Sequence, residues 1–113
     1  MPTRLVSLDG HGDIPIDQVL VVVGRHSSCD VRIESARVSR RHCCLGLDRE
    51  GVLIRDLGST NGTRINGQRI EMGLLRPGNE LVIAHLRYRL EVCQEVETAS
   101  ETDIPPSTSV PNI

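Results

Sequence analysis

Short apolar runs alternate with turn-forming residues along most of the chain, from residue 4 to residue 93. The runs are rich in Val, Ile and Leu and are too short for ordinary helices, so they favour strands. No segment carries the 3.6-residue apolar period of an amphipathic helix over a useful length. We predict strands over residues 4–8, 18–23, 31–33, 42–47, 52–56, 63–65, 68–70, 80–83 and 87–93.

Many short strands with closely spaced turns are typical of an all-β sandwich, here two mostly antiparallel, twisted sheets packed face to face. Two turns are specific. Asn66-Gly67 predicts a two-residue hairpin, because both residues tolerate a positive φ angle. Pro77-Gly78 fits the centre of a type II turn.

Side-chain alternation assigns the faces of the predicted strand over residues 42–47. Successive side chains of a strand point to opposite faces, so Cys43, Leu45 and Leu47 share one face, which we expect to be the core. His42 then points the other way, towards the loop end of the sandwich or its opposite surface.

The composition changes near residue 95, where the chain becomes acidic and rich in Pro, Ser and Thr. Such a segment buries too little apolar surface to offset the entropy lost on ordering. We therefore predict one folded domain over residues 1–94 and a disordered tail over residues 95–113.

Composition and charge narrow the classes of function. The 113 residues include no Phe or Trp, and Tyr88 is the only aromatic residue, which argues against single-stranded nucleic-acid binding by base stacking. The net charge is −2, so no overall positive field attracts nucleic acid. All 13 basic residues are Arg, and the segment from Gly24 to Arg64 carries more Arg than acidic residues. Arg suits bidentate binding of phosphate or carboxylate.

The cysteines and the apolar runs argue against a metal site and a membrane span. The four cysteines form no C-x-x-C pair, so we expect no zinc site and read them as reduced thiols, mostly filling the core. No apolar region follows the first four residues, so we expect no signal peptide. The longest aliphatic run, residues 19–23, is far too short to cross a bilayer. We expect a cytoplasmic protein without a cofactor.

Three polar segments between the predicted strands carry the candidate chemistry: Gly24-Arg25, Ser39-Arg40-Arg41-His42 and Gly58-Ser59-Thr60-Asn61-Gly62-Thr63. They offer guanidinium groups, hydroxyls and an amide, all of which donate hydrogen bonds. A phosphothreonine presents about −1.5 to −2 charges and three strong acceptor oxygens. We therefore predict a surface that reads phosphate on a protein.

In order and spacing these segments resemble the signature of the forkhead-associated (FHA) domain: Gly24-Arg25, Asp30-Val31, Ser39 with His42, Asp56 with Ser59 to Thr63, and the Asn66-Gly67 turn. The resemblance covers about residues 4–94. It implies an FHA-type β-sandwich that binds phosphothreonine peptides through loops at one end and has no catalytic activity.

The resemblance also implies a role for each matching residue. Arg25 and Ser39 hold the phosphate, Arg40 adds a contact to phosphate or peptide, Thr60 reaches the phosphate, and Asn61 holds the peptide main chain. Gly24, His42, Ser59 and Gly62 shape the loops. Arg37 lies where the family can read the peptide residue three places after the phosphothreonine. The implied partners are a threonine-phosphorylated protein and a Ser/Thr protein kinase pathway.

Three other interpretations are open. A cysteine enzyme would pair His42 with Cys43, but adjacent strand residues point to opposite faces. An interaction scaffold would have a degenerate phosphate site, against which Arg25, Ser39 and Asn61 argue. Finally, a phosphorylated threonine of the tail, such as Thr98, would bind the domain's own site or that of a neighbouring copy.

Overall fold

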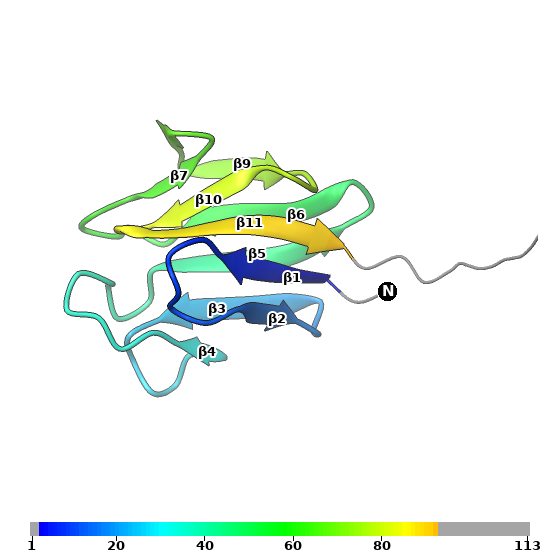
Figure 1. Ribbon diagram of the computed structural model, residues 1–113. Helices are drawn as coiled ribbons and strands as arrows, with labels where there is room; N and C mark the ends of the chain where they lie inside the picture. The colour runs from blue at the N-terminus through cyan, green and yellow to red at the C-terminus, as the bar shows by residue number, and fades with distance from the viewer. Residues whose placement is uncertain (1–2, 93–113) are drawn as a thin grey trace, which may run out of the picture.

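The computed structural model describes residues 3–92, which form two sheets packed face to face and no helix (Figure 1). The first sheet has the spatial order β2 (Ile14–Ile16), β1 (Thr3–Ser7), β11 (Leu86–Val92), β10 (Glu80–Ile83), β7 (Thr63–Ile65) and β8 (Gln68–Arg69). The second sheet has the order β4 (Val31–Arg32), β3 (Leu20–Gly24), β5 (Cys43–Asp48), β6 (Gly51–Asp56) and β9 (Met72–Leu75). Neighbouring strands are antiparallel except β3 and β4, which are parallel. The predicted all-β sandwich is confirmed, and this part of the chain contains no helix that could cross a membrane.

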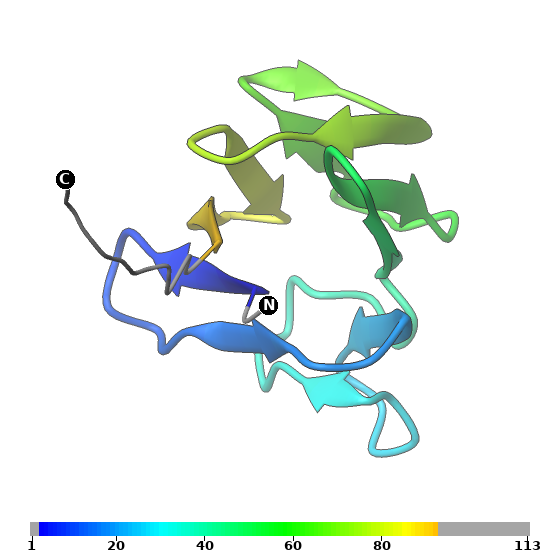
Figure 2. The ribbon, with the colours of Figure 1, turned by 90° about the vertical axis from the view of Figure 1, so that its right-hand side faces the viewer.

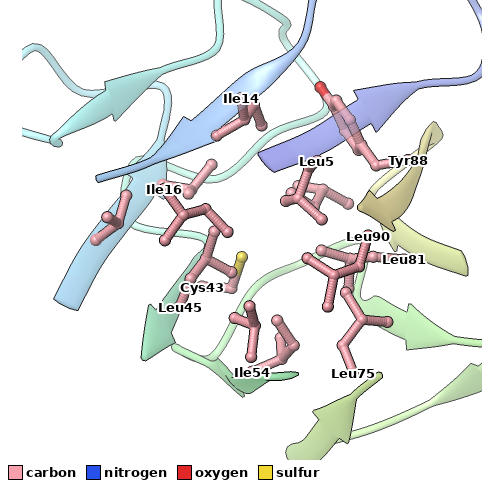
Figure 3. Packing of buried hydrophobic residues seen from close by; sticks show 14 of the residues in the cluster. Leu5, Ile14, Ile16, Cys43, Leu45, Ile54, Leu75, Leu81, Tyr88 and Leu90 are labelled. Atoms are coloured by element: carbon pink, nitrogen blue, oxygen red, sulfur yellow. The ribbon is translucent and has the colours of Figure 1, made fainter. Parts of the chain in front are cut away.

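The core lies between the two sheets and is almost entirely aliphatic (Figure 3). Alternate strand residues such as Leu5, Leu45, Ile54 and Leu90 are fully buried, and each contributes about 1.5–3 kcal/mol relative to exposure. Tyr88 lies at the edge of this cluster with its hydroxyl turned away from the aliphatic side chains (Figure 3). Burial raises the pKa of Tyr88 to about 12, so the phenol is neutral at physiological pH.

Two strands were not predicted from the sequence. β2 contains Pro15, which lacks a backbone N–H, but β2 is an edge strand paired only with β1, where proline is tolerated. β9 contains Gly73, and glycine is depleted in strands. A Cβ atom at Gly73 would lie 3.0 Å from Ile65 Cδ1, so the glycine lets the β7–β8 hairpin lie close to β9.

Both specific turn predictions are confirmed. Asn66 and Gly67 have φ angles of 50° and 85° and join β7 to β8 as a two-residue hairpin. Gly78 has φ 88°, and the Asn79 N–H donates to the Arg76 carbonyl at 2.9 Å, as in a type II turn.

The face assignment for β5 is correct for Cys43 and Leu45, which are fully buried, but wrong for Leu47, which is 41% exposed. Leu47 is the penultimate residue of β5, although its cross-strand partner Val52 is fully buried. His42 precedes β5 instead of opening it, and it points to the loop end, where it is completely buried. The sequence analysis allowed either the loop end or the opposite surface for the His42 side chain.

The cysteines fill the core less than the sequence suggested. Cys43 is buried, whereas Cys29 and Cys44 are only partly buried, and all three are free thiols. Cys93 and the predicted tail, residues 95–113, lie outside the described residues.

The loops that follow β3, β4 and β6 gather at one end of the sandwich, on the left in Figure 1. The β10–β11 turn lies at the same end, whereas β11 itself finishes at the opposite end. Figure 2 shows the molecule from the end at which β11 finishes, with these loops on the far side. The three polar segments of the sequence therefore meet in space.

Candidate functional site

The β3–β4 loop lies directly against the β4–β5 loop. A Cβ atom on Gly24 would lie 2.1 Å from the Arg40 carbonyl oxygen, so only glycine permits this approach. After Gly24, the Arg25 N–H donates to the Ser39 carbonyl at 2.9 Å, and the His26 N–H donates to the Arg40 carbonyl at 3.1 Å. These backbone bonds place Arg25 beside Ser39, as the sequence predicted.

The Arg25 side chain is anchored but not neutralised. Its Nε donates to the Val38 carbonyl at 2.9 Å, while the residue stays exposed and forms no ion pair with any residue from 3 to 92. The terminal guanidinium nitrogens remain available for an oxyanion. Sequence reasoning missed Val38, because a backbone carbonyl has no signature in the amino-acid sequence.

The β6–β7 loop is bonded to the β4–β5 loop through two predicted residues. The Thr60 N–H donates to Ser39 Oγ at 3.1 Å, which leaves the Ser39 hydroxyl proton without an acceptor in the described part of the chain. Asn61 Nδ2 donates to the Arg37 carbonyl at 2.7 Å, so its Oδ1 and its other N–H remain for a ligand. Thr60 and Asn61 are both exposed.

His42 joins the same two loops from underneath. The Ser39 N–H donates to His42 Nδ1 at 3.1 Å, so Nδ1 acts as the acceptor and the proton lies on Nε2. Nε2 then donates to the Gly62 carbonyl at 2.8 Å. Because both ring nitrogens have partners and the ring is fully buried, His42 positions the loops rather than contacting a ligand.

Asp56 organises the β6–β7 loop through four donors. Its carboxylate accepts hydrogen bonds from the hydroxyls of Ser59 and Thr63 and from the backbone N–H groups of Gly58 and Ser59. The Ser59 hydroxyl oxygen in turn accepts the Gly62 N–H at 3.0 Å. Burial pushes the pKa of Asp56 up, but the four hydrogen bonds outweigh burial and hold it below its ordinary value of 3.8.

The lowered pKa of Asp56 predicts an acid-sensitive loop. A carboxylate whose pKa is lower in the folded chain than in the unfolded chain stabilises the fold when it is ionised. This stabilisation is complete above the pKa of the unfolded state and is lost as the pH falls through the pKa of the folded state. We expect the free energy of unfolding to decrease from about pH 5 downwards, and Asp56→Asn to show a smaller decrease. Urea unfolding at a series of pH values measures both slopes.

Asp17→Asn is the control for this prediction, because Asp17 is exposed and forms no hydrogen bond or ion pair with residues 3–92. Its acid slope should match that of the unmodified chain. An Asp56→Asn variant with an unchanged slope would show that the loop hydrogen bonds do not depend on the charge.

Further exposed arginines surround the site. Arg37 and Arg40 are exposed, and their side chains form no hydrogen bond or ion pair with the residues that the structure describes. Arg41 Nη2 lies 3.4 Å from Ser28 Oγ, and Arg69 covers Gly62, with Nη2 3.5 Å from the Ser59 carbonyl. These cations add positive potential near Arg25. Sequence reasoning missed Arg69, because the hairpin that carries it folds back onto Gly62 only in three dimensions.

No group of three or more metal-binding side chains forms among residues 3–92. This end of the sandwich presents hydrogen-bond donors and cations: the Arg25 guanidinium, the half-buried Ser39 hydroxyl, the exposed Thr60 hydroxyl and the Asn61 amide. This set suits a phosphate attached to an extended peptide.

Comparison with known proteins gives concordant results. The model of the FHA domain matches residues 21–84. Glycogen accumulation regulator GarA of Mycobacterium tuberculosis is 33% identical over 72 residues, which are 64% of this chain and 44% of that protein. The oxoglutarate dehydrogenase inhibitor of Corynebacterium glutamicum is 31% identical over 72 residues, which are 64% of this chain and 50% of that protein. The chain thus spans about half the length of these curated relatives.

Similarity extends to three-dimensional structure. A solved structure from an analysis of phosphothreonine-dependent FHA domain interactions superposes with a TM-score of 0.74 and 26% sequence identity, covering 83% of this chain and 99% of that one. FHA domains are phosphopeptide-binding modules that are generally not enzymes. With most of the described strands and all three loops inside the matched region, the chain belongs to the FHA-domain family.

Proposed function

We propose that this chain is a non-catalytic adaptor that binds threonine-phosphorylated proteins through the loops following β3, β4 and β6. The proposal rests on how the Arg25 side chain is held and on its lack of a counter-ion among the described residues. Its Nε is fixed by the Val38 carbonyl, yet its charge has no counter-ion in the described chain, and its backbone lies beside Ser39. A cation held in place and left unpaired is preorganised for an anionic ligand.

The expected affinity follows from the number of good contacts. A charge-assisted hydrogen bond contributes roughly 1.5–3 kcal/mol when well made. Arg25, the Ser39 hydroxyl and the Thr60 hydroxyl supply such contacts to phosphate oxygens. After the costs of association, the total is on the order of −8 kcal/mol, a micromolar dissociation constant.

The neighbouring residues supply contacts to the peptide rather than to the phosphate. Asn61 Oδ1 and its free N–H match a peptide N–H and carbonyl, while its other N–H stays on the Arg37 carbonyl. Arg40 is exposed for a further contact to phosphate or peptide. Arg37 is exposed next to Asn61, and we assign it the position three residues after the phosphothreonine, with a preference for an acidic side chain.

Titration with three matched peptide libraries tests the function: phosphothreonine, phosphoserine and unphosphorylated. We expect phosphothreonine peptides to bind with a micromolar dissociation constant, phosphoserine peptides to bind more weakly, and unphosphorylated peptides to show no measurable binding. The threonine methyl group contributes about 0.8 kcal/mol on burial, so preference over phosphoserine should be at least about fourfold. Equal affinity for phosphorylated and unphosphorylated peptides would refute the proposal.

The same titration tests the scaffold alternative, and a turnover assay tests the enzyme alternative. A scaffold with a degenerate site would bind none of the phosphorylated peptides. A cysteine enzyme would turn over substrate, but burial raises the pKa of the Cys43 thiol and keeps it protonated. Both ring nitrogens of His42 are also already bonded, so His42 has no free position with which to activate the thiol.

The biological setting is part of the proposal. In this proposal the chain couples a Ser/Thr protein kinase to a target, and we place this coupling in the cytoplasm. A phosphorylated tail threonine, such as Thr98, would compete with outside ligands for the same loops. Mass spectrometry after kinase treatment checks this, and an unmodified tail would rule out that form of control.

A further inference from the structure

Two arginines of the β7–β8 hairpin lie side by side. Arg64 on β7 and Arg69 on β8 are direct cross-strand partners, so their side chains lie on the same face of the hairpin. The Ile70 N–H donates to the Thr63 carbonyl at 2.9 Å, which joins the next residues along the two segments. Arg64 and Arg69 therefore form a non-hydrogen-bonded pair, the kind in which opposite side chains approach most closely. We call these two residues the hairpin arginines.

The hairpin arginines have no counter-ion in the described part of the chain. Neither forms an ion pair with residues 3–92. Glu80 begins the neighbouring strand β10, but both of its carboxylate oxygens accept hydrogen bonds from Arg87, at 2.9 and 3.4 Å. Like charges directly opposite one another destabilise a strand pair. The two cations are thus a cost to the free fold, and an anion bound between them would remove that cost.

Arg69 connects the hairpin arginines to the β6–β7 loop. A Cβ atom at Gly62 would lie 2.9 Å from Arg69 Nε and 3.0 Å from its Cζ, so the guanidinium lies against the backbone of this loop. Its Nη2 is 3.5 Å from the Ser59 carbonyl oxygen, at the limit of a hydrogen bond, and the side chain stays exposed. Asn61, which the proposed function assigns to the peptide main chain, directly precedes Gly62. A peptide held by Asn61 therefore passes close to Arg69.

We propose that the hairpin arginines bind a second anionic side chain of the phosphothreonine-bearing protein, an inference that rests on the proposed function. Two guanidinium groups offer forked N–H donors that suit the oxygens of a carboxylate or a phosphate. Gly62 is only two residues beyond Thr60, and an extended peptide advances about 3.3 Å per residue. The second anion therefore lies within about four residues of the phosphothreonine. An acidic residue or a second phosphorylated residue supplies this chemistry.

A double-mutant cycle between peptide and protein tests this contact by fluorescence anisotropy. The starting peptide carries phosphothreonine between neutral residues, and glutamate is placed in turn at each of the four positions before and after it. We expect one of these glutamates to raise the affinity by about three- to tenfold, because exposed ion pairs are individually weak but two cations act together. Arg69→Gln and Arg64→Gln should each remove most of this gain, yet bind the neutral peptide within about twofold of the original affinity.

Phosphoserine at the responsive position distinguishes the two natural sources of the anion. Its charge is about −1.5 to −2, so its gain should exceed that of glutamate and should shrink more as the salt concentration rises. A gain from both side chains supports the site and extends it to acidic sequences. A gain from phosphoserine alone supports the site for doubly phosphorylated proteins.

Two further variants keep the test independent of folding and of net charge. Arg69→Glu places a carboxylate opposite Arg64, so the hairpin should be at least as stable as in the unmodified chain while the gain from glutamate is abolished. Urea unfolding checks the stability. Arg49→Gln is the matched control, because Arg49 is exposed in the β5–β6 turn at the other end of the sandwich and forms no ion pair with residues 3–92. It should leave the gain unchanged.

The outcomes separate this inference from the proposed function. If the neutral phosphothreonine peptide binds but neither glutamate nor phosphoserine gives a gain that depends on Arg64 and Arg69, only this inference is overturned. A gain that survives Arg69→Gln and disappears in Arg37→Gln belongs to Arg37 and overturns it too, as does an equal loss in Arg49→Gln. If the neutral peptide itself fails to bind, the proposed function falls, and this inference falls with it.

Discussion

Arg25→Ala is expected to weaken binding of a phosphothreonine peptide by roughly 10- to 150-fold, the equivalent of about 1.5–3 kcal/mol. The variant removes an unpaired cation that the Val38 carbonyl holds in place, so a charge-assisted contact to phosphate is lost. The fold should be unaffected, because the Arg25 side chain is exposed and its backbone bond to Ser39 remains. Isothermal titration calorimetry with one phosphothreonine peptide measures the change.

Arg49→Ala is the matched control for Arg25→Ala. Arg49 is an exposed arginine in the β5–β6 turn, at the other end of the sandwich, and it forms no ion pair with the described residues. Its removal changes the net charge equally but should change the affinity by less than about twofold in ordinary salt. Equal losses in the two variants would mean that net charge, and not the site, governs binding.

His42→Ala is expected to destabilise the fold by about 2–5 kcal/mol. The fully buried imidazole is replaced by a cavity, and the Ser39 N–H and the Gly62 carbonyl both lose their partner. Chemical denaturation gives the loss of stability. Peptide affinity should fall as well, because His42 holds the β4–β5 and β6–β7 loops in register without contacting the ligand.

His85→Ala tests whether this loss is specific. His85 is an exposed histidine in the β10–β11 turn, and among residues 3–92 its ring has an edge contact with His11 and no hydrogen bond or ion pair. Its replacement should change stability by less than about 0.5 kcal/mol. If His42→Ala were equally harmless, the loops would be held by their backbone bonds alone.

Hydrogen bonds between loops preorganise the site in this molecule. Several hydrogen bonds join the β4–β5 loop to its two neighbours, among them Arg25 N–H to the Ser39 carbonyl, Thr60 N–H to Ser39 Oγ, and Asn61 Nδ2 to the Arg37 carbonyl. A ligand therefore meets donors that are already in position, which lowers the ordering cost of binding. Loops provide the chemistry, and the two sheets hold their ends in place.

Strands and turns that depend on local sequence could be predicted, whereas those that depend on contacts with distant residues could not. Runs such as Val21–Val23 are strands under any arrangement, because β-branched residues suit a pleated surface, and Asn66-Gly67 is a hairpin on local grounds alone. β2 and β9 were missed because Pro15 and Gly73 argue locally against strands. Each is tolerated for a reason set by distant residues: the free edge of β2, and the approach of Ile65 to β9.

The amino-acid sequence alone determined most of the strand pattern, the two turns and the types of donor available for phosphate, because these depend on short-range geometry and on side-chain chemistry. Only the tertiary structure decided which groups meet. The Val38 carbonyl that anchors Arg25, the burial of His42 between two loops and the exposure of Leu47 all arise from segments far apart along the chain. The row of apolar side chains on the outer surface of the second sheet likewise forms only once strand register aligns Leu20, Leu53 and Leu74, since no single strand reveals which residues its neighbours present beside it.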